Sequence, residues 1–192
     1  RGLGDVYKRQ ALMNTLGALM REAKESVVVQ TPYIICDRAM YDTLEAAAGG
    51  TAQVQIITNA PQSGANPCGC VDYLNHKGRI LRTGVSLCEW SGERSMHTKT
   101  LLIDDRLSLI GSFNWDMRSA YLDTELMLLV DSPTLNAALR AETDEMIGQS
   151  RLLMPDGTTA EGEAYTAPAA SPVKLILYTL LRPLILPLRY LL

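Results

Sequence analysis

The chain has 192 residues, of which 47% are apolar, and its formal net charge is −3 at pH 7. This length fits one ordinary domain with a sizeable core, and the apolar fraction excludes a disordered chain. The slight negative charge provides no general attraction to nucleic acid, so no nucleic-acid partner is expected. The cysteines lack the spacing of a zinc site and are expected to be free thiols in a reducing compartment: they are Cys36, Cys68, Cys70 and Cys88.

The opening of the chain predicts a leader, a helix and a strand. Residues 1–10 resemble translated sequencing-adapter read-through, so we expect a non-native leader and exclude it from the fold. Residues 11–25 carry leucine and methionine at helical spacing, which predicts a core-facing helix. Residues 26–35 are rich in valine and isoleucine and predict a buried strand.

Helices and strands alternate in the next part of the chain. Asp37 is a suitable N-cap for one helix, and Asn66 followed by Pro67 is a suitable start for another. The elements expected here are a helix over 37–48, a strand over 53–58, a helix over 67–82 and a strand over 85–89. A solvated polar face is expected on the second helix, formed by Tyr73, His76, Lys77 and Arg79. The alternation favours an α/β sandwich with a mixed central β-sheet flanked by helices.

The stretch 96–125 is the most informative part of the chain and reads M-H-T-K-T-L-L-I-D-D-R-L-S-L-I-G-S-F-N-W-D-M-R-S-A-Y-L-D-T-E. His97 and Lys99 stand two residues apart, so on a strand both side chains would point to the same face. Two short apolar runs flank an Asp-Asp-Arg turn that begins at Asp104. This pattern predicts a β-hairpin that carries the basic pair at one end.

These residue types suit phosphate chemistry. An imidazole such as that of His97 is a nucleophile near neutral pH, and an ammonium such as that of Lys99 neutralises the oxygens of a phosphoryl group. Ser112 and Asn114 can donate further hydrogen bonds to those oxygens. Asp104 is an odd number of residues from Lys99, so we interpret it as a turn residue that holds the basic pair in place. For an isolated H-x-K motif, a core histidine and a solvated lysine would be the usual interpretation.

The spacing H-x-K-x4-D, followed by six residues and then Gly-Ser, resembles the signature of the phospholipase D superfamily. The matching positions are His97, Lys99, Asp104, Gly111 and Ser112. The extension through Glu125 is similar to the second of two motif copies in bacterial cardiolipin synthases. The resemblance covers roughly residues 11–149, within a domain expected to span residues 11–153.

The resemblance implies a phospholipase D-like sandwich in which two such motifs face each other across one site. In these terms the catalytic residues are His97, Lys99 and Asp104, and the residues that support the substrate phosphate are Ser112, Asn114 and Glu125. Glu125 is expected to pair with a cation or to hydrogen-bond the imidazole, because it opens an apolar run. Only one motif copy is present, so we expect the C-terminal half of a longer protein, with a homodimer as the alternative.

The activity implied is phosphatidyl transfer of the cardiolipin-synthase type, through a phosphohistidine intermediate, on a phospholipid such as phosphatidylglycerol. No metal or other cofactor is expected, because lysines and imidazoles supply the charge. One alternative is a phospholipase D or phosphodiesterase that gives the second step to water. Others are a self-dimerising endonuclease, which would need a basic groove, and a membrane-associated scaffold with a dead site.

The end of the chain changes character. Residues 125–130 predict a strand, and Ser132 with Pro133 predicts the start of a helix. Residues 154–172 are rich in small residues and proline, which predicts a linker. Residues 173–192 are leucine-rich, hold three cations and no acid, and are interrupted by two prolines.

Three interpretations of residues 173–192 compete. A spanning helix needs about 20 largely apolar residues, and the prolines and an internal arginine count against it. A basic segment that lies on an anionic membrane surface fits best, and a segment docked on the domain is the third interpretation. The expected location is therefore the bacterial cell membrane, peripheral on the cytoplasmic side.

Overall fold

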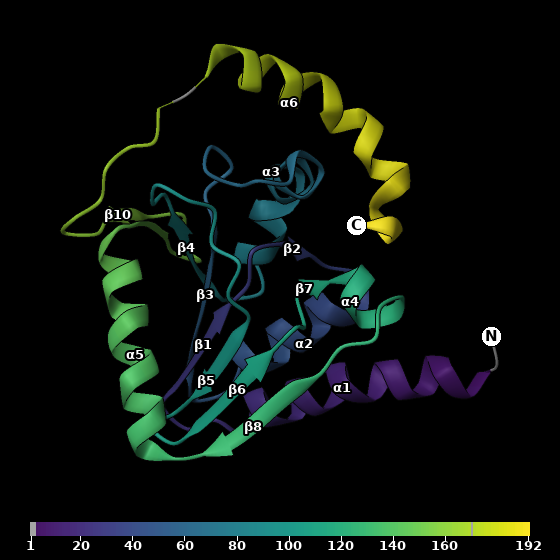
Figure 1. Ribbon diagram of the computed structural model, residues 1–192, viewed down its shortest axis with the longest axis vertical. Coiled ribbons are helices and arrows are strands. Elements are labelled where there is room, and N and C mark those ends of the chain that lie inside the picture. Colours follow the sequence, from purple (N-terminus) through teal and green to yellow (C-terminus); the bar gives the residue numbers. More distant parts are fainter. Residues whose placement is uncertain (1–2, 170) are drawn as a thin grey trace.

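The computed structural model describes residues 3–169 and 171–192, and its centre is an eight-stranded mixed β-sheet with helices on both faces (Figure 1). Three parallel strands form the middle of the sheet: β1 (Ser26–Gln30), β3 (Gln53–Asn59) and β4 (Ser86–Trp90). Antiparallel strands extend it on both sides, in the order β10-β9-β4-β3-β1-β5-β6-β8. Their bounds are β5 (Thr100–Ile103), β6 (Leu107–Gly111), β8 (Met127–Asp131), β9 (Ser150–Leu153) and β10 (Thr159–Glu161). The predicted α/β sandwich with a mixed sheet is confirmed.

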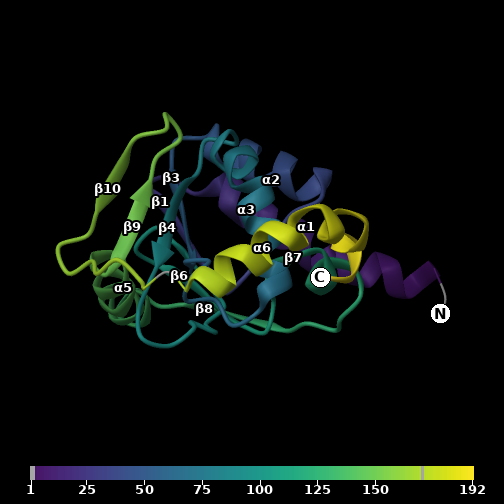
Figure 2. The same ribbon diagram turned by 90° about the horizontal axis from the view of Figure 1, so that it is seen from above.

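Helices cover both faces of the sheet (Figures 1 and 2). The first face carries α1 (Leu3–Glu22), α2 (Arg38–Ala48) and α3 (Pro67–Leu81), and the second carries α5 (Pro133–Gly148). Side chains alternate along β1, so Val27 and Val29 join the core cluster shared with α1 and α2, whereas Val28 joins the cluster under α5. The central strands are thus buried on both sides.

The predicted hairpin and helix caps are confirmed. β5 and β6 pair in antiparallel register, with Thr100 opposite Ile110. The Asp37 carboxylate accepts a hydrogen bond from the backbone N–H of Met40 at 2.9 Å and so caps α2. Asn66 caps α3 in the same way, and Ser132 caps α5. The sequence predicts these caps because a capping side chain bonds to residues that are close to it in the chain.

The strand predicted over residues 26–35 is divided in two. β1 ends at Gln30, and Ile34–Ile35 forms β2, which pairs in parallel with β7 (Trp115–Asp116). Pro32 has no backbone N–H to give to a ladder, so the chain leaves the large sheet there. Thr31 joins the two pieces, since its hydroxyl oxygen accepts a hydrogen bond from Trp115 N at 3.0 Å.

The first helix is longer than the segment predicted over residues 11–25. α1 begins at Leu3 and ends at Glu22. Residues 3–10, which we excluded from the fold, therefore continue the helix, while residues 1–2 lie outside the described part of the chain. Helical structure does not test the origin of this stretch, and the leader stays a prediction.

The polar face predicted on α3 is only partly solvated. Tyr73 is buried, and its hydroxyl donates a hydrogen bond to the Glu89 carboxylate at 2.9 Å. The Lys77 ammonium donates to the same carboxylate oxygen at 2.7 Å. Glu89 is itself buried on β4, where an unpaired carboxylate would be costly. Tyr73 and Lys77 of α3 are the two groups that pair with it. Arg79 is exposed, as predicted, and its guanidinium stacks on the Tyr41 ring.

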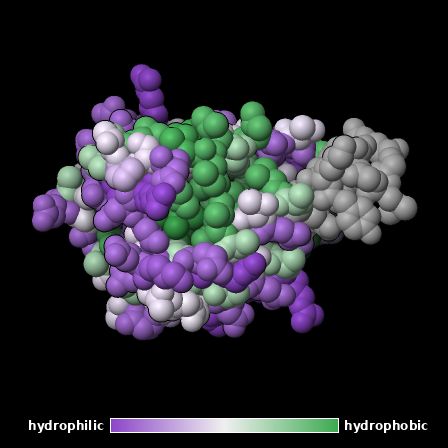
Figure 3. All heavy atoms as spheres, turned by 90° about the horizontal axis from the view of Figure 1, so that it is seen from below, coloured by the Kyte–Doolittle hydropathy of each residue, from purple (hydrophilic) through white to green (hydrophobic). Residues whose placement is uncertain are grey.

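The strand predicted over residues 125–130 is shifted, and it forms an edge of the sheet. β8 occupies Met127–Asp131 and leaves Leu126 and Leu128 largely exposed, at 77% and 63%. Apolar side chains gather on the face of the molecule seen from below (Figure 3), and β8 runs along the bottom of Figure 1. The sequence predicted no such exposed apolar edge.

The last part of the chain holds elements that the sequence did not predict. The segment predicted as a linker contributes β10, which pairs with β9 at the other edge of the sheet. After it, α6 (Pro172–Ile185) and the 3₁₀ helix η1 (Leu186–Leu191) run along the outside of α3 (Figures 1 and 2). Within the described residues, no helix has both the length and the apolar character that a membrane span requires.

Candidate active site

The site is built where the central parallel strands end. The segment 96–99 precedes β5, and its last residue, Lys99, accepts a hydrogen bond through its carbonyl from Gly111 N at 3.2 Å. This contact closes the open end of the β5–β6 hairpin. Residues from the loop after β6 and from α4 (Met117–Tyr121) complete the site.

The basic pair lies together, as the spacing predicted. The Lys99 ammonium is 3.2 Å from His97 Nδ1, and it donates a hydrogen bond to the His97 carbonyl at 2.8 Å. The His97 side chain is exposed, whereas Lys99 is only 9% exposed. A potential nucleophile therefore stands at the surface with a positive charge directly beneath it.

The Lys99 ammonium is buried but has negative neighbours. Burial lowers the pKa of Lys99 below its ordinary value, and the carboxylates of Glu125 and Asp116 partly oppose that shift. The two carboxylates therefore favour the charged form of Lys99, which is the form that can bind a phosphate oxygen. The same burial means that water competes little for it.

Glu125 forms hydrogen bonds with two serines that the sequence did not predict as its partners. Its carboxylate accepts hydrogen bonds from the hydroxyls of Ser112 and of Ser119, the latter at 2.8 Å. It influences Lys99 through charge, which agrees with the expected cation, but in the described structure no hydrogen bond joins it to the imidazole. Ser112 also accepts a hydrogen bond from Leu126 N at 3.1 Å, so its hydroxyl is committed on both sides.

Asn114 is half-buried in the loop after β6 and contacts Ser119 of α4. Its backbone N–H donates to the Ser119 hydroxyl at 3.2 Å, and its side-chain oxygen is buried without a hydrogen-bond partner. It lines a cavity of about 240 Å³. The other lining residues are Tyr33, Ile35, Asn66, Asp116, Arg118, Asp123, Leu191 and Leu192.

Two buried residues of the site were missed by the sequence reasoning. Asp116 caps α4 by accepting a hydrogen bond from Ser119 N at 2.7 Å, and burial raises the pKa of its carboxyl. Asn59, at the end of β3, accepts from Met96 N at 2.7 Å and donates to the Met96 carbonyl at 2.9 Å. The Asn59 side chain thus makes the two backbone hydrogen bonds of Met96 that a neighbouring strand would otherwise make, and it fixes the residue before His97. An asparagine that closes an apolar strand was the available signal.

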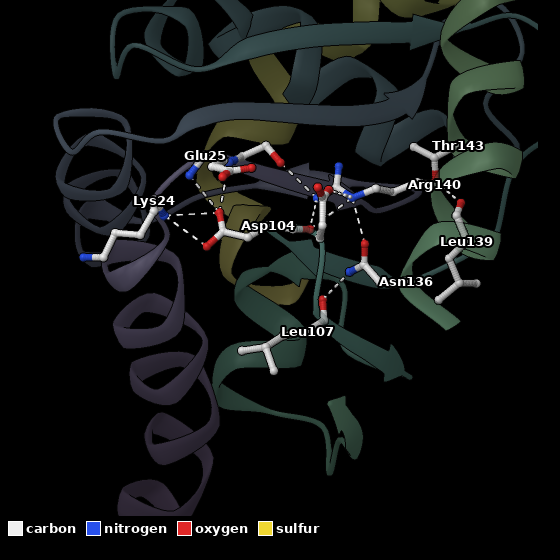
Figure 4. A network of polar contacts seen from close by, with 10 residues as sticks. Lys24, Glu25, Asp104, Leu107, Asn136, Leu139, Arg140 and Thr143 are labelled. Atoms are coloured by element: carbon white, nitrogen blue, oxygen red, sulfur yellow. Dashed lines mark hydrogen bonds and ion pairs between the residues drawn. The ribbon is translucent and has the colours of Figure 1, made fainter. Parts of the chain in front are cut away.

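Asp104 is not brought to the basic pair. It lies in the turn at the far end of β5, roughly 16 Å of extended chain from Lys99. Its carboxylate accepts hydrogen bonds from the backbone N–H groups of Lys24, Glu25 and Ser26, at 2.8 to 3.1 Å (Figure 4). Its carbonyl accepts from the Arg140 guanidinium on α5. The interpretation of Asp104 as a turn residue is confirmed, since it joins α1, β1 and α5 to the hairpin, and its place among the catalytic residues stays a prediction.

The backbone conformation of the turn explains why an aspartate suits position 104. Its φ is +48°, a left-handed conformation that aspartate and asparagine tolerate better than most residues. Burial alone would raise the pKa of Asp104, but the three backbone hydrogen bonds lower it.

Within the described residues no cluster of three or more His, Cys, Asp or Glu side chains could hold a metal ion.

Residues 16–147 match the family model described as "Cardiolipin synthase, PLD-like domain". The chain belongs to this phospholipase D-like family. Its residues are 33% identical over 133 positions to cardiolipin synthase A of Shigella dysenteriae serotype 1, with 68% of the chain and 26% of that protein covered. The same identity and coverage hold for cardiolipin synthase A of Salmonella arizonae. The chain therefore spans about a quarter of the length of these relatives.

Solved structures confirm the phospholipase D-like fold. Nuc of Salmonella typhimurium, a phospholipase D family member, superposes with a TM-score of 0.62 at 18% identity, covering 74% of this chain and 90% of that one. Phosphatidylserine synthase of Haemophilus influenzae superposes with a TM-score of 0.69 at 21% identity. That match covers 94% of this chain and 45% of the synthase chain.

Proposed function

We propose that this phospholipase D-like domain is one half of a phosphatidyl transferase of the cardiolipin-synthase type. The observation that carries the proposal is the exposed His97 imidazole with the buried Lys99 ammonium beneath it, 3.2 Å away. The family match, with cardiolipin synthase A among the relatives, supports a phospholipid as substrate.

The proposed reaction has two displacements at phosphorus. One histidine, His97 or its counterpart in the second half, attacks the phosphodiester phosphorus and forms an N–P bond. The opposite histidine gives its proton to the leaving alcohol as the P–O bond breaks. A second alcohol then attacks the phosphohistidine and loses its proton to that same histidine. The N–P bond breaks, and both histidines return to their starting states.

Lys99 would hold the phosphoryl oxygens during both displacements. Its ammonium is fixed before substrate arrives, and a preorganised charge in a dry site costs little reorganisation as charge develops. Asn114, which lines the same cavity as Asp116, would donate a hydrogen bond from its side-chain amide to a phosphate oxygen. Ser112 would act mainly by holding Glu125, since its hydroxyl is already committed.

The second motif would come from the rest of a longer protein or from another copy of this chain. His97 is exposed, so a second half can place a histidine opposite it. The edge strand β8 begins near Ser112, because Ser112 N donates a hydrogen bond to the carbonyl of Leu126, the residue before the strand, at 3.0 Å. A second half that covered this edge would therefore lie next to His97.

Product analysis tests the proposal against hydrolysis. The assembled two-motif protein is supplied with phosphatidylglycerol, and the lipids are followed by chromatography. Transfer gives cardiolipin and free glycerol, whereas a phospholipase D gives phosphatidic acid and free glycerol. Phosphatidic acid alone would reject the transferase in favour of the hydrolase, and cleavage of DNA in place of lipid would favour an endonuclease.

A further inference from the structure

The three cations of the segment α6–η1 all have hydrogen-bond partners on the domain. The Lys174 ammonium donates to the Gln62 carbonyl at 2.7 Å, and the Arg182 guanidinium donates to the Asn75 side chain at 2.8 Å. Arg189 pairs with the carboxylate of Asp72, at 2.5 Å, and Asp72 is fully buried on α3. All three cations of residues 173–192 thus bind the domain.

The opposite side of the same segment is apolar and exposed. Only Tyr178 and Ile185 are buried against α3. The exposed large side chains are Val173, Leu175, Ile176, Leu177, Leu180, Leu184, Leu186, Leu188, Tyr190 and Leu191, each between 46% and 74% exposed. A helix on a water-soluble surface shows the reverse arrangement, with charges outward. A patch of this size requires an apolar partner.

A lipid surface fits this segment better than a protein does. Protein interfaces carry hydrogen bonds throughout, about one per 100–200 Å². The outer side here offers few groups for that, since the Thr179 hydroxyl is already bonded to the Leu175 carbonyl. A bilayer interior demands no hydrogen bonds. The cations lie on the side away from the leucines, at the level where anionic headgroups would lie if the leucines were immersed.

We propose that α6–η1 lies in the plane of the membrane surface, with its leucine side in the acyl region and the domain above it. This orientation rests on the proposed function, because it matters for activity only if the substrate is a phospholipid. Leu191 and Leu192 line the cavity that also holds Asn114, and Leu192 accepts a hydrogen bond from Arg118 N at 3.0 Å. A bilayer under the segment would therefore adjoin this cavity, which Asp116 of the site also lines.

The test is co-sedimentation of the complete 192-residue chain with vesicles of phosphatidylcholine and phosphatidylglycerol. The variant Ile176→Asp/Leu180→Asp places two charges on the leucine side. Its apparent affinity for vesicles is expected to fall roughly tenfold or more, because charged groups are excluded from the acyl region. Leu128→Asp on β8 is the matched control, because Leu128 and Ile176 are both 63% exposed. That control is expected to bind like the unmodified chain.

Each other outcome overturns the proposal. Equal vesicle binding by the unmodified chain and the double variant would show that the leucine side does not enter lipid. Loss of binding in Leu128→Asp alone would place the membrane contact on β8. A double variant that binds vesicles normally but no longer associates with a second chain, measured by sedimentation velocity, would make the segment a protein interface. Thermal unfolding checks that the variants are folded, and none of these readouts depends on turnover.

Discussion

At the residue scale, the proposed transfer at phosphorus depends on one exposed imidazole that lies next to one buried ammonium. His97 and Lys99 are two residues apart, yet one is open to solvent and the other is not. The carboxylates of Glu125 and Asp116 partly offset the cost of burying the cation at the Lys99 position. An exposed lysine at the same spacing would be hydrated and would have less effect on a phosphate.

We predict that Lys99→Met lowers turnover of the assembled enzyme about 10²- to 10³-fold, since one preorganised oxyanion partner is lost. Lys99→Arg is expected to recover part of it, because the charge remains but the guanidinium does not fit the ammonium position. Steady-state kinetics checks both. Turnover of Lys99→Met within a few-fold of the unmodified enzyme would exclude a role for this charge in the transition state.

The pH profile provides a second residue-scale prediction. The protonated Lys99 is the active form, so activity should decline as pH rises through its pKa, which burial lowers. Glu125→Gln removes a carboxylate that raises this pKa, so the alkaline decline should move to lower pH. Asp123→Asn, in the same loop, is the control and should not move it. An alkaline limb that stays in place in Glu125→Gln would contradict the electrostatic role.

At the element scale, the Asp104 turn and the Asn59 clamp hold the hairpin at its two ends. Asp104→Asn keeps a residue that tolerates a positive φ but loses the charge on three backbone hydrogen bonds. We expect about 1–2 kcal/mol lower unfolding free energy, against little change for the exposed neighbour Asp105→Asn. The pKa of Asp104 is lowered in the folded state, so its contribution is present above the ordinary aspartate value and is lost as pH falls through the lowered one. Urea unfolding at several pH values measures this.

The tail anchor is a separate element-scale prediction. Arg189→Met leaves the fully buried Asp72 without its guanidinium partner and should cost about 3–5 kcal/mol, or release α6–η1 from α3. Arg189→Met with Asp72→Asn should recover most of that loss, because no charge remains buried. Hydrogen exchange over residues 172–192 reports the release. Equal destabilisation by the single and the double variant would show that the pair contributes nothing specific.

The local elements could be predicted from the sequence, and several tertiary relations could not. Caps at Asp37 and Asn66 and the β5–β6 hairpin depend on residues close together in the chain, and all were correct. The contacts of Asp104 and Glu125 depend on partners 6 to 80 residues away, so their spacing in the motif did not reveal them. The inward cations of α6 were likewise hidden, because composition records a charge but not the direction in which it points.

At the scale of the whole molecule, the domain has two exposed apolar surfaces, one on β8 and one on α6–η1. We propose that the exposed β8 edge contacts a second half and that the leucine side of α6–η1 contacts a lipid surface. The chain spans about a quarter of the relatives it matches, which agrees with a domain that completes its site elsewhere. In this arrangement the membrane and the second half approach His97 from different elements.

The most direct measurement is the turnover of phosphatidylglycerol by the assembled two-motif protein carrying His97→Ala. The chain has two histidines, so His76→Gln is the matched control, since it removes the other imidazole. We predict that His97→Ala lowers turnover at least about 10³-fold while His76→Gln stays within a few-fold of the unmodified enzyme. Turnover of His97→Ala close to that of the unmodified enzyme would contradict the assignment of this imidazole to the reaction.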